Sequence, residues 1–563
     1  MESIEGGTQE DCPKIARSVT KVFIANRGEI ALRILRACER LGIGAVCAVS
    51  EADKNSLVAR TSPEVAFLGE APARDSYLNV EKIIAASVSH GCDALHPGYG
   101  FLSENAQFAR AVIDAGLTFI GPDPEMIDLL GDKVAARERV ARYGVPFTRG
   151  SVGGLSDAEL VAAADEIGYP VMVKAAAGGG GRGMRVVRSR NQMIEELPRA
   201  RAEARKFFGS EELYFEQFIE HPRHVEVQIM GDRFGTILHF GTRDCSSQRR
   251  NQKVIEEAPA PFLADDLRER IHVAAVNVAR SVGYHNAGTV EFMVKGEAFY
   301  FLEMNTRIQV EHPATEMVTG HDLVEMQIRV ARGETLPLSQ NDIQVRGHAI
   351  ELRLYAEDPA TDFMPSIGTI SELSLPLPRH GSCRIEQGFE RGDTISRHYD
   401  AMLAKIIVWG GDREDALSRA REAVSHTKVS GVKTNLDFLG WLLRDTPLRL
   451  HPLDIQWIGE HLTADQLSRY ERTLSRDPAH TVIGPVGEYQ ERCVVPHPRG
   501  GKVELVITHR RDGTFVAEPL LGHGDGEQMD RAPRSMWRWS NDRAAAIASV
   551  CDEVIPSLYD YHM

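Results

Sequence analysis

Short apolar runs alternate with amphipathic stretches through the N-terminal quarter of the chain. Val22–Ala25 has the length of a buried strand, and the apolar positions between Ile30 and Leu41 recur at the spacing of one helix face. Further strand-length apolar runs occupy residues 45–49, 94–95 and 118–120. Repeated alternation of strand and helix predicts a doubly wound parallel sheet, so we expect an α/β domain over residues 21–133.

The pattern changes several times after this domain. Residues 134–147 favour a helical linker, and residues 148–218 form a small lobe that contains a glycine-rich segment. A larger lobe over 219–465 has many strand-like runs. Near the end, short strands alternate with Gly and Pro breaks, which indicates an appended, mostly β domain over 480–563.

Composition narrows the class of protein. A net charge of -15 argues against a nucleic-acid-binding surface, and the chain lacks an apolar run long enough to predict a membrane span. Eight scattered cysteines without a C-x-x-C pair suit reduced thiols, so the cytoplasm is the expected compartment. Residues 1–20 carry four acidic groups and are interpreted as a flexible leader, neither a secretory signal nor a transit peptide.

A glycine run, residues 178–183, lies between two apolar runs. Bare backbone N–H groups without a Cβ fit closely around phosphate oxygens, although consecutive glycines cost backbone entropy. The run lacks the G-K-[ST] ending of a P-loop, so on its own it is equally well interpreted as a flexible hairpin tip. Lys174 and Lys133 are candidates to contact the same phosphates, but a single lysine is usually solvated surface.

Two strand-like runs, residues 289–294 and 298–304, flank the turn Lys295-Gly296-Glu297 and predict a hairpin. Glu291 and Glu303 then lie nearly opposite each other. Two facing carboxylates raise each other's pKa unless a cation lies between them. Mg²⁺, which takes carboxylate and phosphate oxygens, is the candidate ion.

Polar residues then occupy every second position, and an extended chain presents them on one face. A solvated face of an amphipathic strand explains this alternation by itself. It does not explain why the series continues from a carboxylate that faces another across a hairpin, so we favour a functional face. Its members are Glu303, Asn305, Arg307, Gln309 and Glu311.

Positive charge is concentrated between residues 243 and 253, in an otherwise acidic chain. Such a concentration suits phosphate or bicarbonate, and a basic surface patch is the alternative. The segment 215–219 is typical of the edge of a nucleotide pocket. His224 is a candidate contact for the nucleotide's sugar, although a lone histidine is more often structural. The basic residues are Arg243, Arg249, Arg250 and Lys253.

Together these segments resemble the biotin carboxylase family of the ATP-grasp superfamily. The matching stretches run in order between residues 21 and 460, and they read IANRGEIALRILRA, HPGYGFLSENA, GDK, GGGGRGMRVV, PRHVEVQ, QKVIEEAPAP, EMNTRIQVEHP and YDAMLAKI. The resemblance implies an α/β and α+β multidomain ATP-grasp fold, with a Rossmann-like N-terminal domain, a glycine-loop lid and a C-terminal lobe. The small, mostly β domain at 480–563 lies outside this pattern.

The resemblance also implies a role for each matched residue. ATP would be bound by Lys133, Lys174, Gly178, Gly179, Gly180, Gly181, Glu216, Gln217, Phe218, Ile219, His224, Gln248, Asn251, Glu291 and Glu303. Mg²⁺ or Mn²⁺ would be held by Glu291, Glu303 and Asn305, and bicarbonate by Lys253, Arg307, Gln309, the Val310 backbone and Glu311. Biotin would contact Arg353, Tyr99 and Asp400, and the catalytic residues would be Arg307, Glu311, Lys253 and Arg353.

In the implied reaction, the γ-phosphoryl group of ATP passes to bicarbonate while Glu311 takes the bicarbonate proton. Carboxyphosphate then yields CO₂ and phosphate, the phosphate removes the N1 proton of biotin, and Arg353 stabilises the enolate-like ureido oxygen. A closed glycine lid keeps water from the intermediate.

The chain departs from the family pattern at a few positions. Ala176-Ala177 precede the glycines where Ser/Gly-Gly is common, Gln217 replaces a lysine beside the adenine, and Asn251 replaces a histidine, which puts a phosphate contact in doubt. No metal, bicarbonate or biotin position is altered, so we expect activity.

No Met-Lys-Met or similar biotin-attachment tetrapeptide occurs, so biotin is expected on a separate carrier protein. A carboxyltransferase subunit is the other expected partner, residues 480–563 are a candidate docking segment, and the resemblance suggests a homodimeric core. Two alternatives stay open: an ATP-grasp ligase for another acceptor, which the series from Arg307 to Glu311 disfavours, and a non-catalytic scaffold subunit. The sequence leaves the final carboxyl acceptor open.

Overall fold

The computed structural model describes residues 18–151, 153–176, 184–377 and 382–462, together with five strands between 489 and 540. The chain divides into two units, Met1–Leu467 and Ser468–Met563, and each is described by itself. The predicted leader and the glycine run lie outside the described residues, apart from residues 18–20. Of the helices that the structure describes, none combines the length and the apolar character needed to cross a bilayer.

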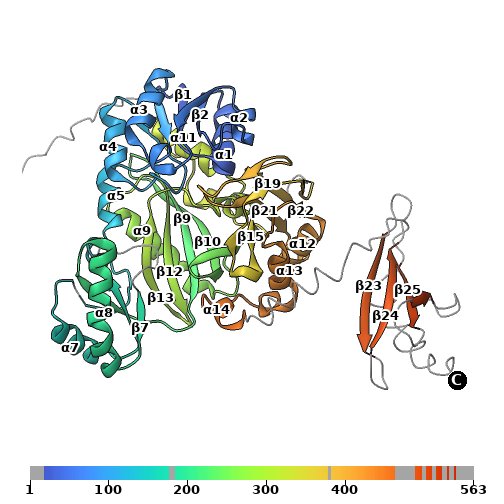
Figure 1. Cartoon of the computed structure of the whole chain (residues 1–563). Coiled ribbons are helices and arrows are strands. Elements are labelled where there is room, and N and C mark those ends of the chain that lie inside the picture. Colours follow the sequence, from blue (N-terminus) through green and yellow to red (C-terminus); the bar gives the residue numbers. More distant parts are fainter. Residues whose placement is uncertain are drawn as a thin grey trace, which may run out of the picture. The chain divides into compact units, whose positions relative to one another are not determined.

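A five-stranded parallel sheet forms the N-terminal region, as the alternating pattern predicts (Figure 1). Its order is β3-β2-β1-β4-β5. The strands are β1 (Lys21–Ile24), β2 (Gly44–Ser50), β3 (Val65–Gly69), β4 (Ala94–His96) and β5 (Thr118–Phe119). The helices are α1 (Gly28–Arg40), α2 (Leu57–Thr61), α3 (Val80–Ser89), α4 (Ala106–Asp114) and α5 (Pro124–Gly131). Ile30 and Ile34 are buried because helical spacing puts them on one face of α1.

The predicted linker helix is shorter than expected. Helix α6 (Lys133–Ala141) ends well before residue 147, because Gly144 takes a left-handed φ of 71° and a residue before proline disfavours helix. The chain then runs extended, and Phe147 pairs with Phe301.

A small lobe follows, built on a three-stranded antiparallel sheet of order β7-β6-β8. Its elements are α7 (Asp157–Ile167), β6 (Val171–Ala175), β7 (Arg185–Val187), α8 (Arg190–Phe208) and β8 (Leu213–Gln217). Ser156 and Glu159 form a capping box that starts α7. Leu160, Val173 and Phe215 belong to a core of the lobe's own.

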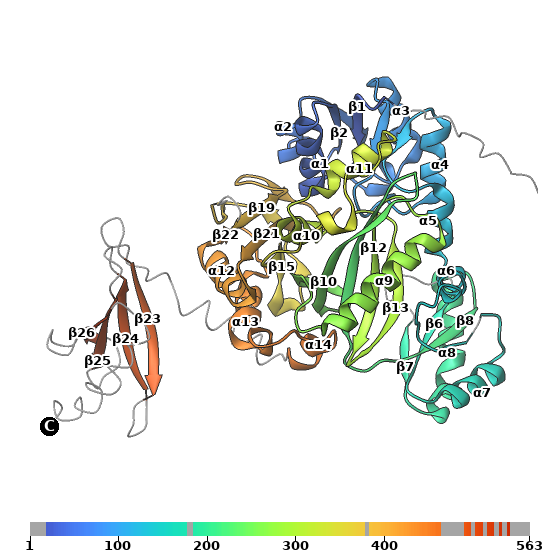
Figure 2. The ribbon, with the colours of Figure 1, turned by 180° about the vertical axis from the view of Figure 1, so that it is seen from behind.

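The central feature is an eight-stranded antiparallel sheet of order β13-β12-β9-β10-β11-β14-β21-β19 (Figure 2). Its strands are β9 (Arg223–Gly231), β10 (Ile237–Arg249), β11 (Gln252–Ala258), β12 (Asn286–Lys295), β13 (Ala298–Asn305), β14 (His348–Tyr355), β19 (Cys383–Gln387) and β21 (Met402–Gly410). Short strand pairs flank it: β15 (Glu357–Asp358) with β16 (Met364–Pro365), β17 (Gly368–Thr369) with β20 (Thr394–Ile395), and β18 (Glu372–Ser374) with β22 (Lys428–Ser430).

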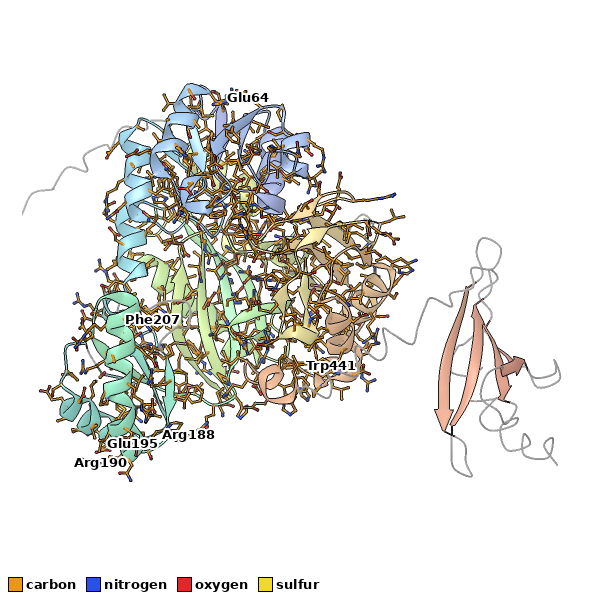
Figure 3. The ribbon with its side chains drawn as sticks, in the orientation of Figure 1. Glu64, Arg188, Arg190, Glu195, Phe207 and Trp441 are labelled. Atoms are coloured by element: carbon orange, nitrogen blue, oxygen red, sulfur yellow. The ribbon has the colours of Figure 1, made fainter. Side chains whose placement is uncertain are left out.

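The two faces of this sheet differ in chemistry. Val225 and Val227 of β9 pack with helix α9, and Ile350 and Ile406 pack with α12 and α13. The residues that alternate with them point to the other face, toward α10. The helices are α9 (Asp265–Ser281), α10 (His312–Thr319), α11 (Leu323–Ala331), α12 (Arg413–His426), α13 (Leu436–Asp445) and α14 (Trp457–His461). On α13, Trp441, labelled in Figure 3, stacks on Phe438 with a centroid separation of 5.9 Å.

The C-terminal unit contains the five strands β23 (Tyr489–Pro496), β24 (Lys502–His509), β25 (Phe515–Gly522), β26 (Met529–Arg531) and β27 (Arg538–Ser540). The neighbouring strands pair antiparallel in the order β23-β24-β25-β26, and β27 also pairs with β25. The short strands predicted within residues 480–563 are confirmed. The domain boundaries proposed from the sequence stay predictions.

Candidate active site

A pocket of about 460 Å³ lies between the strands of the small lobe and the polar face of the central sheet. It collects predicted residues from segments far apart in the sequence. They are Lys133, Lys174, Glu216, Gln217, Phe218, Ile219, His224, Gln248, Asn251, Lys253, Glu291, Glu303, Asn305, Arg307, Gln309, Val310, Glu311 and Arg353.

Three groups of predicted contacts are not among the lining residues. The glycines 178–181 lie outside the described residues. The Tyr99 ring lies 5.8 Å from Nζ of Lys405, and Asp400 accepts a hydrogen bond of 2.8 Å from the Met402 N–H. Neither Tyr99 nor Asp400 lines the pocket, so their assignment to biotin stays a prediction.

The predicted hairpin register is confirmed, because Glu291 of β12 pairs directly with Glu303 of β13. The prediction of an extended chain as far as Glu311 is wrong beyond Asn305. There the chain leaves β13, makes an irregular turn and enters α10, with Glu311 as the N-cap residue. Pro313 in the first turn favours the helix start. The polar residues still reach one pocket, through a turn in place of a strand.

Glu291 is surrounded by side chains that donate to it or carry positive charge. Asn305 Nδ2 and Gln309 Nε2 donate to its Oε1 at 2.9 and 2.7 Å, and Nε2 of His224 lies 3.0 Å from Oε2. Burial raises the pKa of Glu291, but Lys253 and His224 outweigh burial and hold this pKa well below its usual range. The mutual pKa increase expected for the facing glutamates is therefore absent at Glu291, because protein cations supply the counter-charge.

The oxygens of this region fit a hard divalent ion. Glu303 is half-exposed beside Nζ of Lys133, at 3.4 Å, and faces Glu291 across the paired strands on the pocket wall. Carboxylate and amide oxygens are the ligands that Mg²⁺ and Mn²⁺ take. His224, Glu226 and Glu291 form a further compact group, with ligand atoms within 4.8 Å of one another.

Lys253 lies at the centre of a buried carboxylate cluster. Its Nζ is 2.7 Å from Glu226, 3.2 Å from Glu291 and 2.5 Å from Glu311. Arg307 is held by Glu104 at 2.9 Å and donates to Oδ1 of Asn305 at 2.7 Å. Two cations are thus fixed on the wall of a pocket that also holds an ionised carboxylate.

The predicted basic cluster separates into two parts. Arg243 is fully buried and pairs with Glu226 at 2.5 Å, close to Lys253. Arg249 and Arg250 lie at the end of the β10–β11 hairpin, where both pair with Asp362. The cause is the tight turn at Arg250-Asn251, whose two residues have left-handed φ values of 49° and 64° and reverse the chain. Of the four basic residues, only Lys253 lines the pocket, and it was the only one assigned to bicarbonate.

Glu311 lies between two cations. Lys253 donates to its Oε1 at 2.5 Å, and Arg353 donates to its Oε2 at 2.9 Å. Burial raises the pKa of Glu311, but Lys253, Arg353 and Arg243 together hold it well below its usual range. Glu311 is therefore ionised, and its basicity depends on how strongly the neighbouring cations engage other anions.

The end of the pocket where a nucleotide is predicted has apolar residues in its lining, among them Met172, Met184 and Phe218. Lys174 and Arg137 both pair with Glu216, at 2.9 and 2.7 Å. The N–H groups of Gln217 and Phe218 donate to the carbonyls of Arg149 and Pro170, so these two donors are already used and only the other backbone groups of the segment remain for a purine.

Several neighbours of the predicted residues were missed by the sequence analysis. Glu226 pairs with Lys253 and Arg243, and Glu256 receives Nε of Arg353 at 2.5 Å. A signal for Glu226 exists in the sequence HVEVQ, where polar residues alternate with valines in the same period of two as after Glu303. Glu256 carried no such signal, because it lies within a run of acidic and small residues.

Comparison with known proteins agrees with this geometry. Residues 18–127 match the family description "Biotin carboxylase, N-terminal domain", residues 132–339 match "Carbamoyl-phosphate synthase L chain, ATP binding domain", and residues 351–460 match "Biotin carboxylase C-terminal domain". The biotin carboxylase of Nostoc sp. is 50% identical over 420 residues, which are 75% of this chain and 94% of that protein. The chain belongs to the biotin carboxylase family.

Two further relatives extend the comparison. The biotin carboxylase domain of the Hydrogenobacter thermophilus 2-oxoglutarate carboxylase, a dimer solved with MgADP, ADP and bicarbonate, is 44% identical, with a TM-score of 0.75 over 79% of this chain and 98% of that one. The rat methylcrotonoyl-CoA carboxylase subunit alpha is 50% identical over 75% of this chain, which spans only 59% of that subunit. The predicted ATP-grasp fold and family are confirmed.

Proposed function

We propose that the chain uses MgATP and bicarbonate to carboxylate biotin that is attached to a carrier outside these residues. The observation that carries this proposal is Glu311, ionised and buried between Lys253 and Arg353, in the pocket that also contains the paired Glu291 and Glu303. A site that only transfers phosphate does not require a proton acceptor that is paired with two cations.

Glu291, Glu303 and Asn305 are proposed to hold the divalent ion, which when bound neutralises charge on the phosphoryl group. Lys133 and Lys174 are proposed to bind phosphate oxygens near it. Placing positive side chains around the transferring group stabilises the charge that develops in the transition state.

The proton acceptor and the anion site are coupled. Bicarbonate bound at Lys253 and Arg307 engages part of the positive charge that otherwise lowers the pKa of Glu311. The proton affinity of Glu311 then rises when its substrate is present. Glu311 is thereby proposed to take the proton of the bicarbonate hydroxyl.

Arg353 is proposed to act in the second half of the reaction. It holds Glu311 and Glu256 with Nη2 and Nε, at 2.9 and 2.5 Å. Once Glu311 is protonated, its hold on the guanidinium weakens, and Arg353 can donate to the ureido oxygen as negative charge develops there.

Phosphate release from ATP tests the proposal. Purified chain with saturating ATP and Mg²⁺ should release phosphate faster when bicarbonate is added, and faster again with free biotin. Release that ignores bicarbonate refutes the proposal and leaves the scaffold alternative. Release that needs bicarbonate but ignores biotin favours a ligase for another acceptor.

The partners are part of the same proposal. A biotin carrier, a carboxyltransferase and a homodimeric core are proposed, supported by relatives that are named as subunits of methylcrotonoyl-CoA and pyruvate carboxylases. Residues 480–563, within the C-terminal unit, are the candidate docking segment. Removing residues 480–563 should abolish co-purification of the partner subunits and leave carboxylation of free biotin intact, and loss of that activity would contradict the docking role.

A cytoplasmic location is also proposed. It rests on four buried cysteines that are free thiols, Cys38, Cys47, Cys92 and Cys245. Cell fractionation followed by detection of the chain checks it, and recovery in an organelle fraction would overturn it.

A further inference from the structure

The turn that carries the proton acceptor is held residue by residue. Arg243 donates to the side chain of Gln309 at 2.7 Å, and Lys253 and Arg353 hold the side chain of Glu311. Val310, between them, has an apolar side chain. Its carbonyl is held instead, by Nζ of Lys405 at 2.8 Å.

Lys405 is an unusual residue for such a contact, because its side chain is fully buried. Lys405 lies directly opposite Arg353 on β14 and opposite Glu386 on β19. Directly opposed residues of antiparallel strands share a face. Lys405 and Arg353 therefore reach two consecutive residues of one turn from the same polar face, while Ile406, next along β21, is buried with α12 and α13 on the other face.

The contact fixes the orientation of a peptide unit. In a trans peptide the carbonyl and the N–H point in opposite directions. The Gln309 carbonyl is bound by the N–H and by Nδ1 of His312, at 3.3 and 2.7 Å, and the Val310 carbonyl is bound by Lys405. The N–H groups of Val310 and Glu311 therefore turn away from both anchors. Within the part of the chain that the structure describes, neither N–H has an acceptor. Two successive unpaired N–H groups beside Lys253 suit an anion.

We propose that Lys405 is a positioning residue for the bicarbonate site, which it serves by holding the Val310 carbonyl so that the Glu311 N–H, at the other end of the same peptide unit, faces the anion. This inference rests on the proposed function and adds a residue that does not line the pocket. Glu29, whose carboxylate lies 3.2 Å from Nζ of Lys405, provides the counter-charge.

A purely structural role is the competing explanation. Lys405 would then only neutralise the buried Glu29. Removing one partner would leave the other charge buried and unpaired, which would destabilise the fold. The double variant Glu29→Gln/Lys405→Met removes both charges together and keeps the approximate shapes. It separates the two explanations, because it relieves the stranded charge and still leaves the Val310 carbonyl without its donor.

The experiment measures the KM for bicarbonate in ATP cleavage and the Kd for MgADP in the full chain. If Lys405 positions the turn, the double variant should show a KM for bicarbonate raised about tenfold or more, the loss expected for one hydrogen bond to a charged donor. Its Kd for MgADP should stay within about twofold of the original, since the nucleotide end is untouched.

The matched control is Glu257→Gln/Arg413→Met, which removes a similarly buried ion pair of 2.6 Å from the helix-covered face of the same sheet. Its KM for bicarbonate should be unchanged. Three results for the double variant at Glu29 and Lys405 would overturn the inference. They are a KM for bicarbonate equal to the original, a parallel loss of MgADP binding, and the absence of a folded state. A failure of the proposed function would give a different result, because phosphate release by the unmodified chain would then not depend on bicarbonate.

Discussion

The two faces of the central sheet are built from the same strands and have opposite chemistry. One face presents Val227, Phe292 and Ile350 to α9, α12 and α13. The other presents charged rows, with Glu226 paired to Glu291 and to Arg243, and Glu256 opposite Glu351. A strand alternates its side chains, so a shift of register by one residue would exchange the faces.

The difference separates stability from chemistry. Each large apolar side chain buried on the first face contributes about 1.5–3 kcal/mol. Buried ion pairs on the second face gain little net stability over apolar residues of the same volume. The charged face is therefore best explained by what it binds, and substitutions on the two faces should have separable effects.

The largest expected effect is on the polar face. Glu311→Gln keeps the shape of the turn and removes the proposed proton acceptor, so bicarbonate-dependent ATP cleavage should fall by about 10²–10⁴-fold in kcat. Phosphate release measures the loss, and an unchanged Kd for MgADP shows that the nucleotide end is intact. Activity within tenfold of the original would exclude Glu311 as the base.

A comparable effect on stability is expected on the apolar face. Phe292 is fully buried against Phe299 and Phe301, so Phe292→Ala should lower the free energy of unfolding by about 3–5 kcal/mol. Urea unfolding followed by fluorescence measures it. The KM for bicarbonate of the folded fraction should be unaltered, and a raised KM would show that the two faces are not separable.

Two adjacent glutamates of β11 should respond to pH in opposite ways. Burial raises the pKa of Glu256 to about 7, although Arg353 opposes this. Burial also raises the pKa of Glu257, but His348 and Arg413 outweigh it and lower that pKa below its ordinary value of 4.5. The contribution of Glu256 to stability is thus present below pH 4.5 and lost as pH rises through 7, whereas that of Glu257 is present above 4.5 and lost as pH falls.

Thermal unfolding between pH 4 and 8 checks these signs. The Tm of the original chain minus that of Glu256→Gln should fall as pH rises, until the variant is the more stable. The same difference for Glu257→Gln should rise. Parallel pH profiles for the two variants would contradict the assignment of the shifts to the two faces.

The smallest effect is expected at the hairpin end. Arg250 is 70% exposed and pairs with Asp362 at 2.8 Å, so Arg250→Gln should change stability by less than about 1 kcal/mol. The KM for bicarbonate should change by less than twofold. A tenfold increase would return Arg250 to the anion site, from which the hairpin separates it.

Much of the fold followed from periodicity. The strand–helix alternation between Ile24 and Phe119 predicted the parallel sheet, and the turn at Lys295-Gly296-Glu297 predicted the register of Glu291 with Glu303. These elements are local, so a short window of sequence contains their cause. The residue roles came mainly from the family resemblance.

What escaped prediction depends on tertiary contacts. The turn after Asn305 is set by the start of α10, and the burial of Arg243 is set by Glu226 on a neighbouring strand. Lys405 lies far along the chain from Val310, so no local pattern joins them. The alternation after Glu303 predicted the correct set of pocket residues. The reason was wrong, because an irregular turn, and not an extended strand, brings these residues together.

The connection from β13 to α10 has a consequence for length variation in this family. Loops between a strand and a helix normally tolerate insertions and deletions. Here Gln309, Val310 and Glu311 are each tied to a different cation, and Glu311 also begins the next helix. An added or deleted residue between Asn305 and His312 would disrupt all of these contacts together. Relatives that keep the activity should therefore keep the number of residues between Asn305 and His312 unchanged.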